Sequence, residues 1–208
     1  MLNTTDHSYQ GIITGLHRRS VTTILAQEGY IAKQFYREGF ADIGTQGHKL
    51  LDAFDKGLKF KAPDIYLRYL KPYKAMLDTT GIKIIDSEVE IEEPMLGYAG
   101  QLDKIALHPR MGHGIMDVKF SSCGYLAWHE YQTEGYRQGL RWHPKYKDME
   151  IKWRGGIILS PDCELPKIIN HDRIPEIEKI WRAICIVNAD KHRHKVRMEE
   201  ITAEEGWW

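Results

Sequence analysis

The chain has 208 residues, and its 29 basic and 29 acidic residues give a formal net charge of zero. Hydrophobic residues make up 42% of the chain, which excludes an intrinsically disordered protein, and the length suits one domain around one core. No apolar run approaches the roughly 20 residues of a membrane span, residues 1–10 lack the apolar stretch of a signal peptide, and three cysteines argue against a disulfide scaffold. We therefore expect a globular protein of the cytoplasm.

The first part of the chain, about residues 1–80, is predicted to be helical. Apolar side chains recur at helical spacing over residues 20–40, 46–58 and 64–79, and Gly81 ends the third helix. The final part, residues 171–208, is predicted to contain one long helix over 173–197, with Pro175 in its first turn, and a short tail ending in two tryptophans.

Strands and one helix are predicted for the middle part, residues 81–170. Alternating apolar residues and turn signals indicate a three-stranded meander and then a helix and a fourth strand, over 83–92, 96–107, 114–120, 125–141 and 154–160. A fifth strand over 165–170 is a candidate edge strand. These elements favour a single α/β domain over residues 1–208.

Two carboxylates and a lysine are predicted to meet in one hairpin of this meander. Residues 108–114 carry a proline and two glycines, which are typical of a turn. With the tip in the middle of that stretch, Asp103 faces Asp117 and Gln101 faces Lys119, about 5 Å apart at Cβ. Because side chains alternate along a strand, Asp117 and Lys119 share a face.

Such a cluster suits metal chemistry on a phosphate. Two close carboxylates repel each other unless they share a cation or a proton, and Mg²⁺ prefers oxygen ligands. A metal there could polarise a phosphate and acidify a bound water, while Lys119 could orient the water or stabilise charge. The alternative is an exposed hairpin that carries solvated Asp and Lys side chains.

Two further stretches carry candidate site residues. His48 lies near the start of a predicted helix, on or beside its inward face, where histidine is ordinarily a core residue but where neutral imidazole is also a metal ligand. Gln132 and Tyr136 lie one helical turn apart on an aromatic-rich stripe. They could contact a phosphate or a base, or they could simply pack against the core.

Four motifs in a fixed order give the chain a family resemblance. They are G-x-x-x-H at 44–48, G-x-x-D at 100–103, D-x-K at 117–119 and Q-x-x-x-Y at 132–136. Together they resemble the RecB-like exonuclease branch of the PD-(D/E)XK nuclease superfamily. Residues 19–25, RSVTTIL, are similar to the opening of phage-encoded and mitochondrial genome maintenance exonucleases of that branch.

The resemblance implies a fold and an activity. The fold would be a restriction-endonuclease-like αβββαβ core, with a mixed central sheet flanked by helices and an N-terminal helical cap. The activity would be a DNA exonuclease dependent on Mg²⁺ or Mn²⁺, phage-encoded and acting in recombination, repair or replication. Its partners would be DNA ends and a single-strand annealing or replication protein, and the oligomeric state stays open.

The resemblance also implies roles for individual residues. The metal would be held by His48, Asp103, Asp117 and the Val118 carbonyl, with Glu88 or Glu90 as a further ligand. Lys119 would be the catalytic lysine beside Asp117 and Asp103, and Gln132 and Tyr136 would position it or the DNA backbone. DNA contacts are predicted for Arg19, Gln132, Tyr136, Arg137 and Arg141.

Two features depart from parts of the superfamily. Asp117 stands where many members carry glutamate. Relatives with an iron–sulphur cluster hold it with four cysteines, whereas this chain has only Cys123, Cys163 and Cys185, without C-x-x-C spacing, so no such cluster is expected.

A neutral net charge is unusual for a DNA binder. A non-catalytic module that binds single-stranded DNA, or an endonuclease on the same core, stays open as an alternative.

Overall fold

A computed structural model describes residues 2–3, 8–31, 40–120, 126–162 and 164–205. Cys123, Cys163 and the two terminal tryptophans lie outside these residues. Short strands open the chain and three helices follow, namely β1 (Leu2–Asn3), β2 (Ser8–Gln10), β3 (His17–Ser20), α1 (Val21–Gln27), α2 (Phe40–Asp55) and α3 (Asp64–Thr80). The remaining elements are β4 (Lys83–Glu93), β5 (Tyr98–His108), β6 (Gly112–Phe120), α4 (Trp128–Leu140), β7 (Trp153–Leu159), β8 (Ile169–Asn170) and α5 (Ile177–Glu205).

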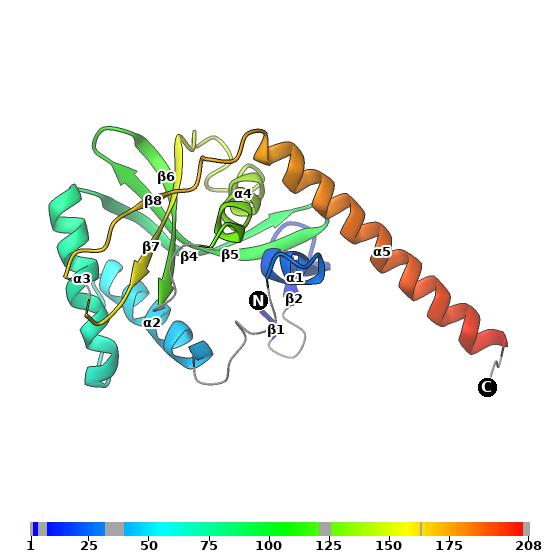
Figure 1. Cartoon of the computed structure of the whole chain (residues 1–208), viewed down its shortest axis with the longest axis horizontal. Coiled ribbons are helices and arrows are strands. Elements are labelled where there is room, and N and C mark those ends of the chain that lie inside the picture. The colour runs from blue at the N-terminus through cyan, green and yellow to red at the C-terminus, as the bar shows by residue number, and fades with distance from the viewer. Residues whose placement is uncertain (1, 4–7, 32–39, 121–125, 163, 206–208) are drawn as a thin grey trace.

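Helices pack on both faces of one open, mixed sheet (Figure 1). On one face, α1, α4 and the start of α5 share a core cluster with β4 and β5, which includes Leu102 and Trp181. On the other face, α2 and α3 share a second cluster with β6 and β7, which includes Met116 and Ile157. This arrangement confirms the predicted α/β class with a mixed sheet flanked by helices.

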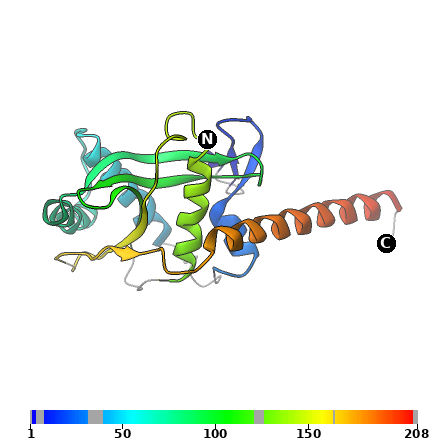
Figure 2. The ribbon, with the colours of Figure 1, turned by 90° about the horizontal axis from the view of Figure 1, so that it is seen from above.

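The long helix α5 leaves the body of the molecule. Its first turns are buried against the core through Trp181 and Cys185, and the helix then runs outward (Figure 2). None of the helices in the described ranges combines the length and the hydropathy that crossing a membrane requires.

The strand β5 organises the sheet because both of its edges are used. One edge pairs antiparallel with β4 along most of its length. The other edge is divided: Tyr98 and Ala99 pair parallel with β3, whereas residues 104–108 pair antiparallel with β6. β6 in turn pairs in parallel with β7.

The predicted hairpin register is confirmed where the two strands pair. Lys104 lies opposite Met116 and Ile105 opposite Ile115, as predicted, and Asp103 lies just beyond the last pair, where its side chain contacts Val118. The ladder ends there, although both strands are described throughout, so the prediction that Gln101 faces Lys119 was wrong. Beyond this point β6 continues to pair with β7 on its other edge, and the paired neighbour of Gln101 is Glu90 of β4.

Several predicted helix bounds differ from the structure. Of the helix predicted over 20–40, residues 32–39 lie outside the described residues, and the described helix ends at Gln27, where Gly29 adopts a left-handed φ of 78° and the chain turns back. α2 begins at Phe40, so residues 44–48 lie inside the helix rather than at its opening. α5 begins at Ile177, after Pro175, and the intervening Glu176 has a φ of 55°. The N-terminal part also contains β1–β3, which are too short and polar to show an apolar alternation.

Candidate functional site

Three side chains from three elements form a cluster that fits a divalent metal. The Nδ1 atom of His48 on α2 lies 3.4 Å from Oε1 of Glu88 on β4 and 3.8 Å from Oδ1 of Asp103 on β5. One ligand atom from each residue falls within 4.8 Å of the others. One imidazole and two carboxylates are a donor set that divalent cations accept in proteins.

Two atoms of this cluster are buried without a hydrogen bond. Neither Nδ1 of His48 nor Oε1 of Glu88 has a hydrogen-bond partner among the described residues, although polar atoms so placed are normally satisfied. Burial opposes protonation of His48, but the carboxylates of Asp103 and Glu88 outweigh it and raise the pKa of the imidazole. The residues therefore fit a bound cation, which would take the place of that proton.

Glu88 reaches the cluster from an unusual backbone conformation. Its φ is 53°, a left-handed value that costs a non-glycine residue about 1–3 kcal/mol. The register of β4 against β5 shifts just before it, between Ile84 and Asp86. Sequence patterns left Glu88 and Glu90 as equal candidates, and of the two only Glu88 belongs to the cluster.

A second group of side chains links β6 to α4. The Lys119 ammonium lies 2.8 Å from Oδ1 of Asp117 and donates to Oε1 of Gln132 at 3.0 Å. The Gln132 amide donates to the hydroxyl of Tyr136 at 2.8 Å. The other carboxylate oxygen of Asp117 is buried and has no hydrogen-bond partner among the described residues.

A main-chain contact joins the two groups. Oδ2 of Asp103 accepts a hydrogen bond from the N–H of Val118 at 2.7 Å, between Asp117 and Lys119 in sequence. Asp103 is thus tied to β6 where the ladder between β5 and β6 ends. The metal-ligand roles expected of Asp117 and of the Val118 carbonyl stay predictions.

Helix α2 is fixed to the sheet at three points along one face. His48, Asp52 and Asp55 follow one another at spacings of four and three, which places them on one stripe of the helix. Asp52 accepts a hydrogen bond from the hydroxyl of Ser87, and Asp55 lies 2.7 Å from the Lys104 ammonium. Ser87 and Lys104 face each other across β4 and β5, next to Glu88 and Asp103.

Gly47 allows α2 to approach the sheet. A Cβ atom at this position would lie 2.5 Å from the ring of Phe120, which is too close for an unshifted side chain. The same ring lies edge-on to His48, with 5.2 Å between the ring centroids. The glycine that the site requires is thus Gly47, whereas the motif glycine Gly44 has open space around it.

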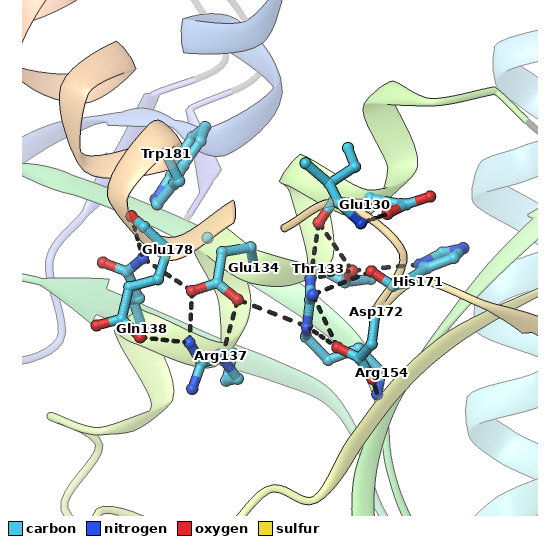
Figure 3. Close-up of polar contacts among 12 residues, drawn as sticks. Glu130, Thr133, Glu134, Arg137, Gln138, Arg154, His171, Asp172, Glu178 and Trp181 are labelled. Atoms are coloured by element: carbon cyan, nitrogen blue, oxygen red, sulfur yellow. Dashed lines mark hydrogen bonds and ion pairs between the residues drawn. The ribbon is translucent and has the colours of Figure 1, made fainter. Parts of the chain in front are cut away.

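A buried polar network connects helix α4 to β7 and to the segment before α5 (Figure 3). Arg154 on β7 donates to the carbonyl oxygens of Glu130 and His171 at 2.8 and 3.0 Å, and to Asp172 at 2.9 Å. The Thr133 hydroxyl lies 3.2 Å from a ring nitrogen of His171. Gln132 and Tyr136 therefore project from a helix whose position is set by β7 and the segment before α5.

Three arginines predicted to contact DNA have protein partners. Arg137 contacts Glu134 and Glu178, both at 2.7 Å, and Arg141 contacts Glu178 at 3.1 Å. Arg19 donates to Asn188 on α5. The structure thus places all three against the protein, and their contact with DNA stays a prediction.

Two aromatic residues near the site had no motif to identify them. The Lys119 ammonium lies 5.4 Å from the centroid of the Trp128 ring, in cation–π range. Burial, followed by the charges of Glu88, Glu90 and Asp103, raises the pKa of Tyr9 to about 12. Tyr9 belongs to the N-terminal strands, which the sequence pattern did not predict.

Comparisons with known proteins give one weak structural likeness. The sequence matches no family model and no curated protein. A solved structure, LHK-Exo in complex with dAMP, is similar to this chain with a TM-score of 0.45 and 10% sequence identity, over 91% of this chain and 95% of that one. At this TM-score and identity, inference about the chemistry rests on the residues of this chain.

Proposed function

We propose that the protein hydrolyses phosphodiester bonds of DNA with the help of a divalent metal ion. The observation that carries the proposal is the hydrogen bond between Asp103 and the Val118 N–H, because it joins a cluster that fits a metal to the Lys119 group. A metal ion can activate the water and polarise the phosphate, and a fixed cation beside it can stabilise the charge that develops, so the two groups together suit phosphodiester hydrolysis.

Each residue of the two groups has a separate task in this proposal. A divalent cation held by His48, Glu88 and Asp103 would supply Lewis-acid polarisation of the phosphate and a more acidic water. Lys119 has three N–H donors, of which Asp117 and Gln132 engage two. Its third donor can orient the attacking water or stabilise negative charge on the phosphate oxygens.

Gln132 and Tyr136 orient the side chain of Lys119. Tyr136 accepts from the amide nitrogen of Gln132, which fixes the amide so that its oxygen faces Lys119. Burial raises the pKa of Tyr136 well above its ordinary value, so its hydroxyl stays neutral at physiological pH. The pair therefore acts as a rigid support rather than as an acid or base.

The finer assignment is an exonuclease that uses Mg²⁺ or Mn²⁺ on DNA ends in recombination, repair or replication. It is supported by the four ordered motifs and by the His48 cluster. A phage origin rests on the motif resemblance in the same way. An exonuclease degrades linear DNA and leaves closed circles intact, which separates it from an endonuclease on the same core.

The deciding experiment uses end-labelled linear DNA, single- and double-stranded, with Mg²⁺, Mn²⁺ or EDTA. The wild-type protein should shorten the strands only with metal. Lys119→Ala should lower the rate at least a hundredfold, whereas Lys147→Ala, at an exposed lysine outside both groups, should not change it. Cleavage that survives Lys119→Ala or EDTA would refute the mechanism. DNA binding without any product would favour the non-catalytic binding module.

A further inference from the structure

A second site lies on the other flank of α2. Between α2, the start of α3 and the chain that joins them is a hollow of about 560 Å³. Gln46 and Lys49 of α2 line one side, and Phe60, Lys61 and Tyr66 line the other. Its size is within the range of roughly 300–1,000 Å³ that small-molecule sites occupy.

The residues of the hollow suit a nucleotide. Phe60 and Tyr66 are half-buried aromatic side chains, on which a base can stack. Lys49 and Lys61 are exposed ammonium groups that can meet a phosphate, and no described residue forms an ion pair with either of them. Lys56, by contrast, is already engaged by Asp52 at 2.6 Å.

The charge of the hollow distinguishes it from two others on the described part of the chain. No carboxylate lines it. The hollow beside α5 contains Glu134, Asp172 and Glu178, and the one below α4 contains Asp148 and Glu150. In both of those, carboxylates offset the basic side chains, so an anion gains less from binding there.

The hollow also lies close to the metal cluster. Gln46 and Lys49 flank His48 in sequence, but they lie on the exposed side of the helix whereas His48 faces Glu88 and Asp103. A helix with its side chains is roughly 10–12 Å across, and this sets the scale of the separation. A strand of a few nucleotides can span that distance.

We propose that this hollow binds an unpaired nucleotide of a DNA strand that is cleaved at the metal cluster, a few nucleotides away from the hollow. Lys49 and Lys61 contact its phosphate, and the rings of Phe60 and Tyr66 stack on its base. This inference rests on the proposed nuclease function and adds a subsite for single-stranded DNA. The subsite contributes affinity and leaves the chemical step to the Lys119 group.

Binding is measured first, without catalysis, by fluorescence anisotropy of a labelled oligothymidylate in EDTA. The double variant Lys49→Gln/Lys61→Gln should bind more weakly and reduce the slope of log affinity against log salt by about 1. Phe60→Leu should weaken binding about tenfold and Phe60→Tyr should restore it. Lys74→Gln, at an exposed lysine of α3 outside the hollow, is the matched control and should change affinity less than twofold.

Cleavage kinetics then separate this inference from the proposed function. Phe60→Leu should raise KM about tenfold with kcat unchanged, because Phe60 belongs to neither the metal cluster nor the Lys119 group. If the wild-type enzyme cleaves DNA and Lys119→Ala does not, but the hollow variants behave like Lys74→Gln, the subsite is refuted and the nuclease stands. A wild-type protein that neither binds nor cleaves DNA would refute both.

Discussion

The buried ammonium group of Lys104 lies 2.7 Å from the carboxylate of Asp55 and joins the centre of β5 to the last turn of α2. The Lys104 side chain is 0% exposed and that of Asp55 is 3% exposed. The Tyr73 hydroxyl donates to the same carboxylate at 3.0 Å. Because Asp103 and His48 lie on these same two elements, the ion pair helps to set the distance between two of the candidate metal ligands.

Removing one partner of this ion pair should lower the free energy of unfolding. Asp55→Ala leaves an uncompensated buried ammonium, and we expect a loss of about 3–5 kcal/mol in the free energy of unfolding, measured by urea denaturation. Replacing both partners, as Asp55→Leu/Lys104→Met, should recover most of that loss. Asp78→Ala, at an exposed carboxylate of α3, serves as the control. A loss below 1 kcal/mol in Asp55→Ala would show that the pair is not structural.

Replacing the two glycines of α2 by alanine, one at a time, should change the stability of the protein in opposite directions. At Gly44 a Cβ has open space, so Gly44→Ala should stabilise the protein by about 0.5–1 kcal/mol through helix propensity. At Gly47 it would meet the Phe120 ring, so Gly47→Ala should destabilise by about 1–3 kcal/mol. Gly47→Ala should also weaken Mn²⁺ binding, followed by calorimetry, because Phe120 packs on His48. Equal effects of the two substitutions would contradict the geometry.

Backbone strain at Glu88 predicts a trade between stability and metal binding. Glycine accepts a φ of 53° without penalty, so Glu88→Gly should be at least as stable as the wild type. The same variant should lose Mn²⁺ affinity by tenfold or more, since it removes a carboxylate of the cluster. Glu90→Gly, two residues along the same strand, should cost about 0.5–1 kcal/mol. If Glu88→Gly is the less stable of the two, the strained conformation is not the one in solution.

Stability should fall between pH 6.5 and pH 4. Burial lowers the pKa of both His129 and His171 to about 4, against an ordinary value near 6.5. The unfolded chain therefore takes up protons in this window while the folded chain does not, so stability is full above pH 6.5 and is lost as the pH falls.

The expected loss at pH 5 is on the order of 1–2 kcal/mol for each histidine, measured by urea denaturation. His171→Asn should remove about half of the pH dependence. His192→Gln, at an exposed position of α5, should leave it intact. A His171→Asn variant with the same pH dependence as the wild type would exclude a neutral buried His171.

Local patterns predicted much of the site. The turn residues at 108–114 and the alternation of the flanking strands gave the register that pairs Lys104 with Met116, next to Asp103 and Asp117 in the two strands. The stripe of α4 placed Gln132 and Tyr136 one turn apart, and the structure shows them hydrogen-bonded. In each case the distance between the residues is fixed by one element or one hairpin, so the sequence alone contains the necessary information.

Other features depend on partners that are remote in sequence. The ladder between β5 and β6 stops at Lys104 and Met116, while β6 continues to pair with β7, about 40 residues later in the chain, and the alternation within the hairpin predicts neither. Arg137 and Arg141 have the composition of a basic patch, but Glu178 reaches them from α5. The left-handed conformation of Glu88 is not signalled by its residue type, because glycine is the residue that ordinarily adopts it.

The divided edge of β5 bears on when the metal cluster can form during folding. The two strands on that edge come from opposite sides of the sequence, and the cluster itself draws on residues 48, 88 and 103. Contacts of such separation can form only after long loops of the chain have closed. Under the proposed function, a nascent or partly folded chain therefore carries no nuclease centre, and DNA is exposed to cleavage only by molecules that have completed their fold.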